Sequence, residues 1–97
     1  MKFMVEMTVQ LPPEMDRKAR AELLAREKAY AQGLQHDGRW EHLWRVAGRY
    51  ANVSIFEVGS ADELHEIVSG LPLFPYMDIR VTALAKHPSA IERGEQS

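Results

Sequence analysis

Two segments, one near each end of the sequence, alternate between apolar and polar residues. Residues 76–83 alternate in the same way as residues 3–9, in which Phe3, Val5, Met7 and Val9 are expected to point to one side. A period of two is typical of a strand that buries only one of its faces. The sequence therefore predicts a half-buried strand near each end of the chain.

Two segments after the first strand are predicted to be helices. Asp16 is a candidate N-cap for a helix over about 17–35, which is rich in Ala, Glu, Lys and Arg. Ser60, with Glu63 at the capping-box position, is expected to begin a second helix that Gly70 ends. We therefore expect one long helix and one short helix.

The segment between the two helices contains two further apolar runs, residues 40–47 and 53–58. The short connection at Gly48 and Arg49 predicts a hairpin. Residues 71–75, which contain two prolines, are expected to form an extended connection. The resulting order is β-α-β-β-α-β, the ferredoxin-like pattern of the α+β class. It implies a four-stranded antiparallel sheet with two helices on one face.

Length and composition restrict the classes of function. The 97 residues suit one domain spanning 1–97, with a polar C-terminal tail at about 87–97. A net charge of -2 argues against partners such as nucleic acid or an anionic membrane surface. The absence of cysteine excludes disulfides and thiolate metal sites, and favours a cytoplasmic location. We expect neither a signal peptide nor a membrane span.

Glu27 interrupts the apolar face of the first predicted helix, which is formed by Leu23, Leu24, Ala31 and Leu34. A carboxylate in the middle of an apolar face must be paired, protonated or directed into a cavity. One interpretation is a general base whose pKa is raised by burial. The alternatives are a structural ion pair, or a helix rotated so that Glu27 reaches water.

Other polar residues in the hairpin are candidates for a binding site. Arg45 lies inside an apolar strand, where it can either bind a carboxylate or extend its charged end to solvent. Tyr50, Asn52 and Ser54 lie where the chain returns, and this pattern also fits ordinary turn chemistry. No metal site is expected, because none of the histidines pairs with another at a ligand spacing; they are His36, His42, His65 and His87.

Longer motifs extend along nearly the whole chain. They occur in order as M-x-F-x-V-x-M-T-V at 1–9, E-K-A-x-A-Q at 27–32, W-x-H-L-W-R-x-A-G at 40–48, Y-A-N-x-S-x-F-x-V at 50–58 and L-P-L-F-P-Y-M-D-I at 71–79. Several long motifs in the same order and spacing are far more specific than one short motif. With them the chain resembles the muconolactone Δ-isomerase family.

The resemblance implies an intramolecular isomerase that uses no cofactor and no metal. Such an enzyme converts muconolactone, a small lactone carboxylate, into 3-oxoadipate enol-lactone during catechol degradation. It also implies a ring-like homodecamer. Two alternatives stay open, a chloromuconolactone dehalogenase on the same scaffold and a non-catalytic ligand-binding or assembly domain.

The resemblance also implies roles for individual residues. Glu27 matches the acidic position of the family and is expected to be the catalytic base. Arg45 is the first candidate for binding the carboxylate of the substrate, and Lys28 and Arg49 are its rivals. The expected substrate-binding residues are therefore Arg45, Lys28 and three hydrogen-bond donors around the lactone, Tyr50, Asn52 and Ser54.

Overall fold

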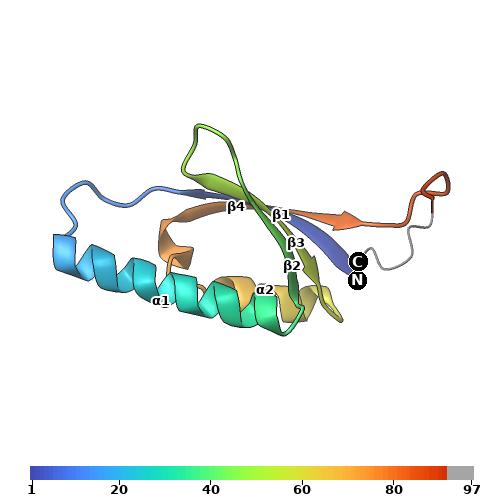
Figure 1. Cartoon of the computed structure of the whole chain (residues 1–97), viewed down its shortest axis with the longest axis horizontal. Coiled ribbons are helices and arrows are strands. Elements are labelled where there is room, and N and C mark those ends of the chain that lie inside the picture. Colours follow the sequence, from blue (N-terminus) through green and yellow to red (C-terminus); the bar gives the residue numbers. More distant parts are fainter. Residues whose placement is uncertain (92–97) are drawn as a thin grey trace.

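The computed structural model describes residues 1–91, which form four strands, two α-helices and one short 3-10 helix (Figure 1). In chain order these are β1 (Lys2–Val9), α1 (Arg17–His36), β2 (Trp40–Arg45), β3 (Ala51–Glu57), α2 (Ala61–Ser69), η1 (Phe74–Tyr76) and β4 (Met77–Leu84). The strands form one antiparallel sheet in the order β2-β3-β1-β4, and both α-helices lie on one side of it. The predicted ferredoxin-like α+β fold is confirmed.

β1 is a central strand of the sheet, and its alternation places half of its side chains in the core. Val5 lies opposite Ser54 on β3 and opposite Val81 on β4, so these three side chains share the face that carries the helices. The buried residues of β1 are its four predicted apolar members, Phe3, Val5, Met7 and Val9. α1 and α2 cover this face with residues at helical spacing, namely Leu23, Ala31, Leu34, Leu64, Ile67 and Val68.

Both helices begin at the predicted caps. The Asp16 carboxylate accepts a hydrogen bond from the Ala19 amide at 3.0 Å, and the Ser60 hydroxyl accepts one from the Glu63 amide at 3.1 Å. The Glu63 carboxylate accepts from the Gly59 amide at 2.8 Å, one residue before the cap itself. Each cap satisfies an amide that the first turn leaves without a helical partner.

The connection at residues 71–75 is a turn, so the prediction of an extended segment was wrong. The Phe74 amide donates to the Leu71 carbonyl at 2.9 Å, and the Tyr76 amide donates to the Leu73 carbonyl at 2.9 Å. Pro75 fits in the first turn of a short helix, because the amide hydrogen that proline lacks would have no helical acceptor there. The turn brings the Leu73 backbone toward α1.

The hairpin lies two residues earlier in the sequence than predicted. β2 ends at Arg45 instead of Ala47, and β3 already begins at Ala51. The Val46 amide donates to the Ala51 carbonyl at 3.0 Å, and Gly48 has a φ of 80°, a conformation that side chains with a Cβ rarely adopt. The connecting loop uses the positive φ of this glycine to reverse the chain.

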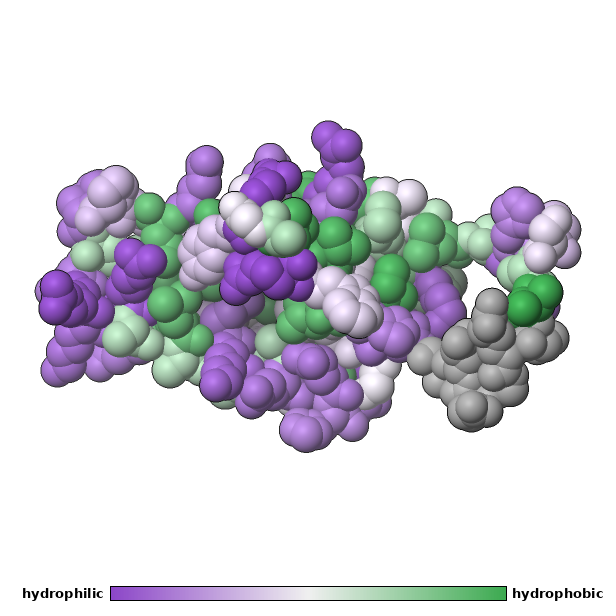
Figure 2. All heavy atoms as spheres, turned by 45° about the horizontal axis from the view of Figure 1, so that its top comes forward, coloured by the Kyte–Doolittle hydropathy of each residue, from purple (hydrophilic) through white to green (hydrophobic). Residues whose placement is uncertain are grey.

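The aromatic residues divide between the core and the surface. Phe3, Trp40 and Phe56 are buried, whereas Trp44 is 66% exposed. Trp44 lies opposite Val53, on the face of the sheet without helices. Apolar side chains are exposed among polar ones in the view tilted toward this face (Figure 2).

Two further expectations concern the C-terminal tail and membrane-spanning segments. Residues 87–91 of the predicted polar tail form neither helix nor strand, and residues 92–97 lie outside the described part of the chain. No helix within residues 1–91 has the length and apolar character needed to cross a membrane.

Candidate active site

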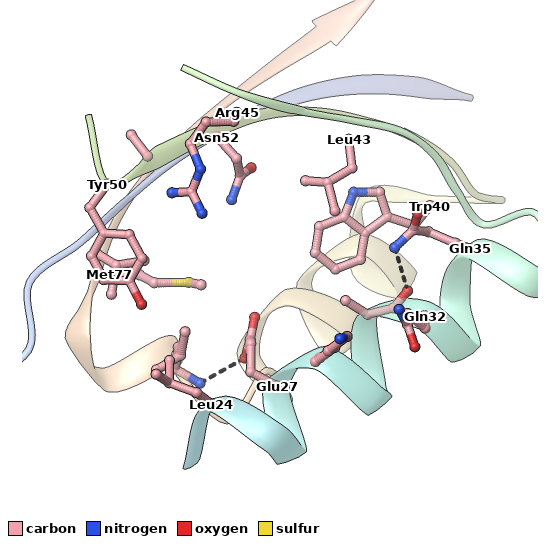
Figure 3. A pocket seen from close by; sticks show the side chains of 15 residues that line it. Leu24, Glu27, Gln32, Gln35, Trp40, Leu43, Arg45, Tyr50, Asn52 and Met77 are labelled. Atoms are coloured by element: carbon pink, nitrogen blue, oxygen red, sulfur yellow. Dashed lines mark hydrogen bonds between the residues drawn. The ribbon is translucent and has the colours of Figure 1, made fainter. Parts of the chain in front are cut away.

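A cavity of about 450 Å³ lies between α1 and the β2–β3 side of the sheet. Apolar side chains form much of its wall, including Leu24, Trp40, Leu43 and Met77 (Figure 3). The polar and charged side chains that reach it come from α1 and from the hairpin, and they include Glu27, Lys28, Gln32, Gln35, Arg45 and Asn52. Such a mainly apolar pocket with a few convergent polar groups is typical of a small-molecule site.

Glu27 projects from α1 into this cavity (Figure 3). Its Oε1 accepts a hydrogen bond from the Leu73 amide at 3.0 Å, which the turn at Phe74–Tyr76 has brought to the helix. Burial raises the pKa of the Glu27 carboxyl, and the hydrogen bond from Leu73 opposes that shift by stabilising the charged form. A carboxylate with a raised pKa and one oxygen held in place is suited to general base catalysis.

Arg45 and Tyr50 lie on the opposite wall from Glu27 (Figure 3). The guanidinium carbon of Arg45 is 5.4 Å from the centre of the Tyr50 ring, a distance at which a cation is attracted to an aromatic face. Arg45 pairs with Asn52 across the hairpin, so both side chains lie on the cavity side of the sheet. The wall opposite the carboxylate therefore carries a positive charge beside a neutral amide.

Ser54 lies behind Asn52 and is fully buried, with 0% of its surface exposed. Its hydroxyl donates to the Asn52 Oδ1 at 2.8 Å, and the Asn52 Nδ2 donates to the Met7 Sδ at 3.6 Å. Asn52 lines the cavity, whereas Ser54 does not contribute to its wall. The two residues share a face of β3, but only the first can reach a ligand directly.

The structure brings together most residues that the sequence singled out. The residues that line the cavity are Glu27, Lys28, Arg45, Tyr50 and Asn52. Among the described residues, Arg49 contributes nothing to the wall and Ser54 supports it from behind.

Three cavity residues with a polar group in the side chain were missed: Gln32, Gln35 and Trp40. Gln35 follows Glu27 by eight residues and could have been found from this spacing, since residues at i, i+4 and i+8 share one face of a helix. Trp40 gave no such signal, because a buried tryptophan is most simply explained as core. Here it serves both purposes, contacting Phe56 at 4.8 Å between ring centres and lining the cavity.

The site combines a carboxylate, a cation and hydrogen-bond donors around an apolar cavity. Within residues 1–91, no group of three or more His, Cys, Asp or Glu side chains is arranged to hold a metal ion. The side chains present can bind a small carboxylate through Arg45 and remove a proton from it through Glu27.

Comparison with known proteins finds one family over most of the chain. The profile of the family described as muconolactone delta-isomerase matches residues 1–90. A protein named muconolactone Delta-isomerase from Cupriavidus pinatubonensis is 62% identical over 91 residues, which are 94% of this chain and 99% of that protein. One of the same name from Rhodococcus opacus is 53% identical over 90 residues, 93% of this chain and 97% of that protein.

Solved structures give the same result. The crystal structure of a muconolactone isomerase superposes with a TM-score of 0.92 at 52% identity, covering 99% of this chain and 100% of that one. A 5-chloro-2-hydroxyhydroquinone dehydrochlorinase from Burkholderia phenoliruptrix superposes with a TM-score of 0.63 at 19% identity, over 90% of this chain and 96% of that one, which shows a shared fold alone. The chain belongs to the muconolactone delta-isomerase family.

Proposed function

We propose that the protein is a muconolactone Δ-isomerase, which converts muconolactone into 3-oxoadipate enol-lactone in catechol degradation. The observation that carries the proposal is the position of Glu27, a half-buried carboxylate with a raised pKa that faces Arg45 across an apolar cavity. The identity of 62% to a protein named for this reaction supports the choice of substrate.

The reaction moves one proton and one double bond within the lactone ring. In the proposed mechanism Glu27 removes the proton from the ring carbon that bears the acetate arm. The electron pair of that bond forms a new double bond, the old one shifts, and negative charge develops on the lactone carbonyl oxygen. The proton then returns to the carbon next to the carbonyl, so that the carboxylate of Glu27 is regenerated and no other reactant is consumed.

The other residues bind the substrate in this proposal. Arg45 holds the acetate carboxylate, with Lys28 as the second candidate on the wall of the cavity. Tyr50 and Asn52 are proposed as donors to the lactone, where they stabilise the charge that develops on its oxygen. Apolar neighbours such as Trp40 and Leu24 exclude water from the reacting carbons.

Assembly as a cytoplasmic, ring-like homodecamer completes the proposal. Leu43 and Tyr50 line the cavity and are each 40% exposed in the single chain, which supports a neighbouring chain that covers this part of the wall. Light scattering from the purified protein measures the molar mass directly, and a monomer would contradict the decamer.

The direct test is an ultraviolet assay of the purified protein with muconolactone, without added metal or cofactor. We expect turnover to the enol-lactone. If muconolactone is not consumed, the proposed function is wrong, and a chlorinated lactone then tests dehalogenation. If neither compound reacts but one binds, the cavity is a ligand-binding site only.

The raised pKa of Glu27 predicts the acid limb of the pH profile. The base must be ionised, so kcat/KM should fall as the pH decreases through the pKa of this carboxyl. Because burial raises that pKa, the fall should occur at a higher pH than the ordinary value of 4.5 would give. Initial rates measured across the acidic range check this, and an acid limb at or below the ordinary value would contradict the assignment.

A further inference from the structure

The side-chain amide of Asn52 is held from two sides. Its Nδ2 donates to the Met7 Sδ at 3.6 Å, and its Oδ1 accepts from the Ser54 hydroxyl at 2.8 Å. Met7 and Ser54 are both 0% exposed, so these contacts do not compete with water. The strand register explains the arrangement, because Met7 lies opposite Asn52 on β1 and Ser54 follows two residues later on the same face of β3.

These two contacts fix which end of the amide faces which neighbour. A thioether sulfur has lone pairs and no hydrogen to donate, so the group that faces Met7 must be the NH₂ end. The carbonyl end then faces Ser54, whose hydroxyl can rotate to donate to it. The reversed amide would place a carbonyl oxygen against the sulfur lone pairs. The surroundings of Asn52 therefore select one of its two orientations.

The NH₂ end has a second hydrogen. One N–H is directed to Met7, and no acceptor for the other is found among residues 1–91. Asn52 lines the cavity on the wall opposite Glu27 (Figure 3), so a bound ligand can supply this acceptor. An oxygen that gains negative charge during a reaction is a better acceptor than the neutral oxygen from which it forms.

We propose that Ser54 and Met7 are positioning residues that fix the Asn52 amide so that it presents an N–H donor, and not its carbonyl oxygen, to the reacting lactone. The identity of the accepting oxygen rests on the proposed function. Ser54 then acts on the reaction without touching the substrate, since it does not line the cavity and its hydroxyl donates to Asn52.

The first test is the replacement Ser54→Ala, made in the parent chain and in an Asn52→Ala chain. In the parent chain we expect kcat to fall about tenfold, the usual loss when one hydrogen bond is removed, with KM changed by less than about twofold. In the Asn52→Ala chain the same replacement should leave kcat unchanged, because the residue through which Ser54 acts is already absent. An equal loss in both chains would overturn the proposal.

Val5→Ala is the matched control for packing. Val5 lies directly opposite Ser54 on β1, is also 0% exposed and does not line the cavity. This variant should lower the unfolding temperature at least as much as Ser54→Ala and leave kcat within about twofold. If it lowers kcat as much as Ser54→Ala does, the effect of Ser54 is merely structural.

A second measurement does not depend on turnover. Asn52 is the only asparagine of the sequence, so isotopic labelling of asparagine gives one side-chain amide in a nuclear magnetic resonance spectrum. The saturated lactone acetate, which cannot isomerise, should shift the signal of the hydrogen that faces the cavity. In Ser54→Ala this shift should be lost, and both amide hydrogens should exchange faster with water.

The two measurements separate the possible failures. If the parent isomerises muconolactone but the amide signals respond equally in Ser54→Ala, the positioning role is wrong and the proposed function stands. If the parent does not isomerise muconolactone, the proposed function is wrong and the amide has no such role in that reaction. The amide signals would still show whether Ser54 holds Asn52 in place.

Discussion

Replacement of Glu27 by glutamine is expected to lower kcat by about 10²–10⁴-fold, the range by which general base catalysis accelerates proton transfer. Glutamine has the same shape, and its amide oxygen can still accept the hydrogen bond that Leu73 donates to the carboxylate at 3.0 Å. It cannot accept a proton from carbon. Steady-state rates with muconolactone measure the loss, and turnover within about threefold of the parent would rule out Glu27 as the base.

Thermal unfolding of the same variant separates lost chemistry from lost folding. Because burial raises the pKa of Glu27, the folded chain binds this proton more tightly than the unfolded chain. That contribution to stability is present at acidic pH and is lost as the pH rises through the raised pKa. Glutamine is neutral at every pH, so the variant should unfold at the same or a higher temperature than the parent at neutral pH. Glu22→Gln, an exposed position on the same helix, should change neither property.

The apolar periodicity of α1 predicted that Glu27 faces the sheet, because the geometry of a helix depends on local sequence. The caps and the apolar spacing of α1 determine which of its faces meets the sheet, so a carboxylate on that face could be recognised without coordinates. The partner of Glu27 could not be recognised in this way. Leu73 lies 46 residues further along the chain, and its amide reaches the helix only because the segment predicted as extended forms a turn.

The alternation of a strand indicates which side of the sheet a hairpin residue faces, but not how deeply that residue is buried. Arg45 and Asn52 were separate candidates for the binding site, and the register pairs them on the side of the cavity. The same alternation applies to Ser54, yet this residue is fully buried, donates to Asn52 and does not line the cavity. Depth depends on the neighbours of each position, and Ser54 lies between Val5 and Leu43 on the adjoining strands. A single sequence does not contain that information directly.

Replacement of Arg45 by alanine is expected to raise KM for muconolactone by about tenfold or more, the effect of losing a hydrogen bond to a charged group. The change in kcat should be smaller, because the acetate arm carries the same charge before and during the proton shift. Arg45→Lys should recover only part of the loss, since lysine keeps the charge but cannot form two parallel hydrogen bonds with one carboxylate. Initial rates over a range of muconolactone concentrations separate the two constants.

Arg49→Ala is the matched control for Arg45→Ala. Both arginines belong to the same hairpin region and both are exposed, but only Arg45 lines the cavity, where its guanidinium lies 5.4 Å from the Tyr50 ring centre. If only the loss of positive charge mattered, KM would rise alike in both variants, and this rise would diminish as salt is added. Direct binding by Arg45 requires that KM rise for Arg45→Ala alone. If KM is unchanged in Arg45→Ala and rises in Lys28→Ala, the lysine on α1 binds the carboxylate instead, and the acetate arm of the substrate points toward the helix.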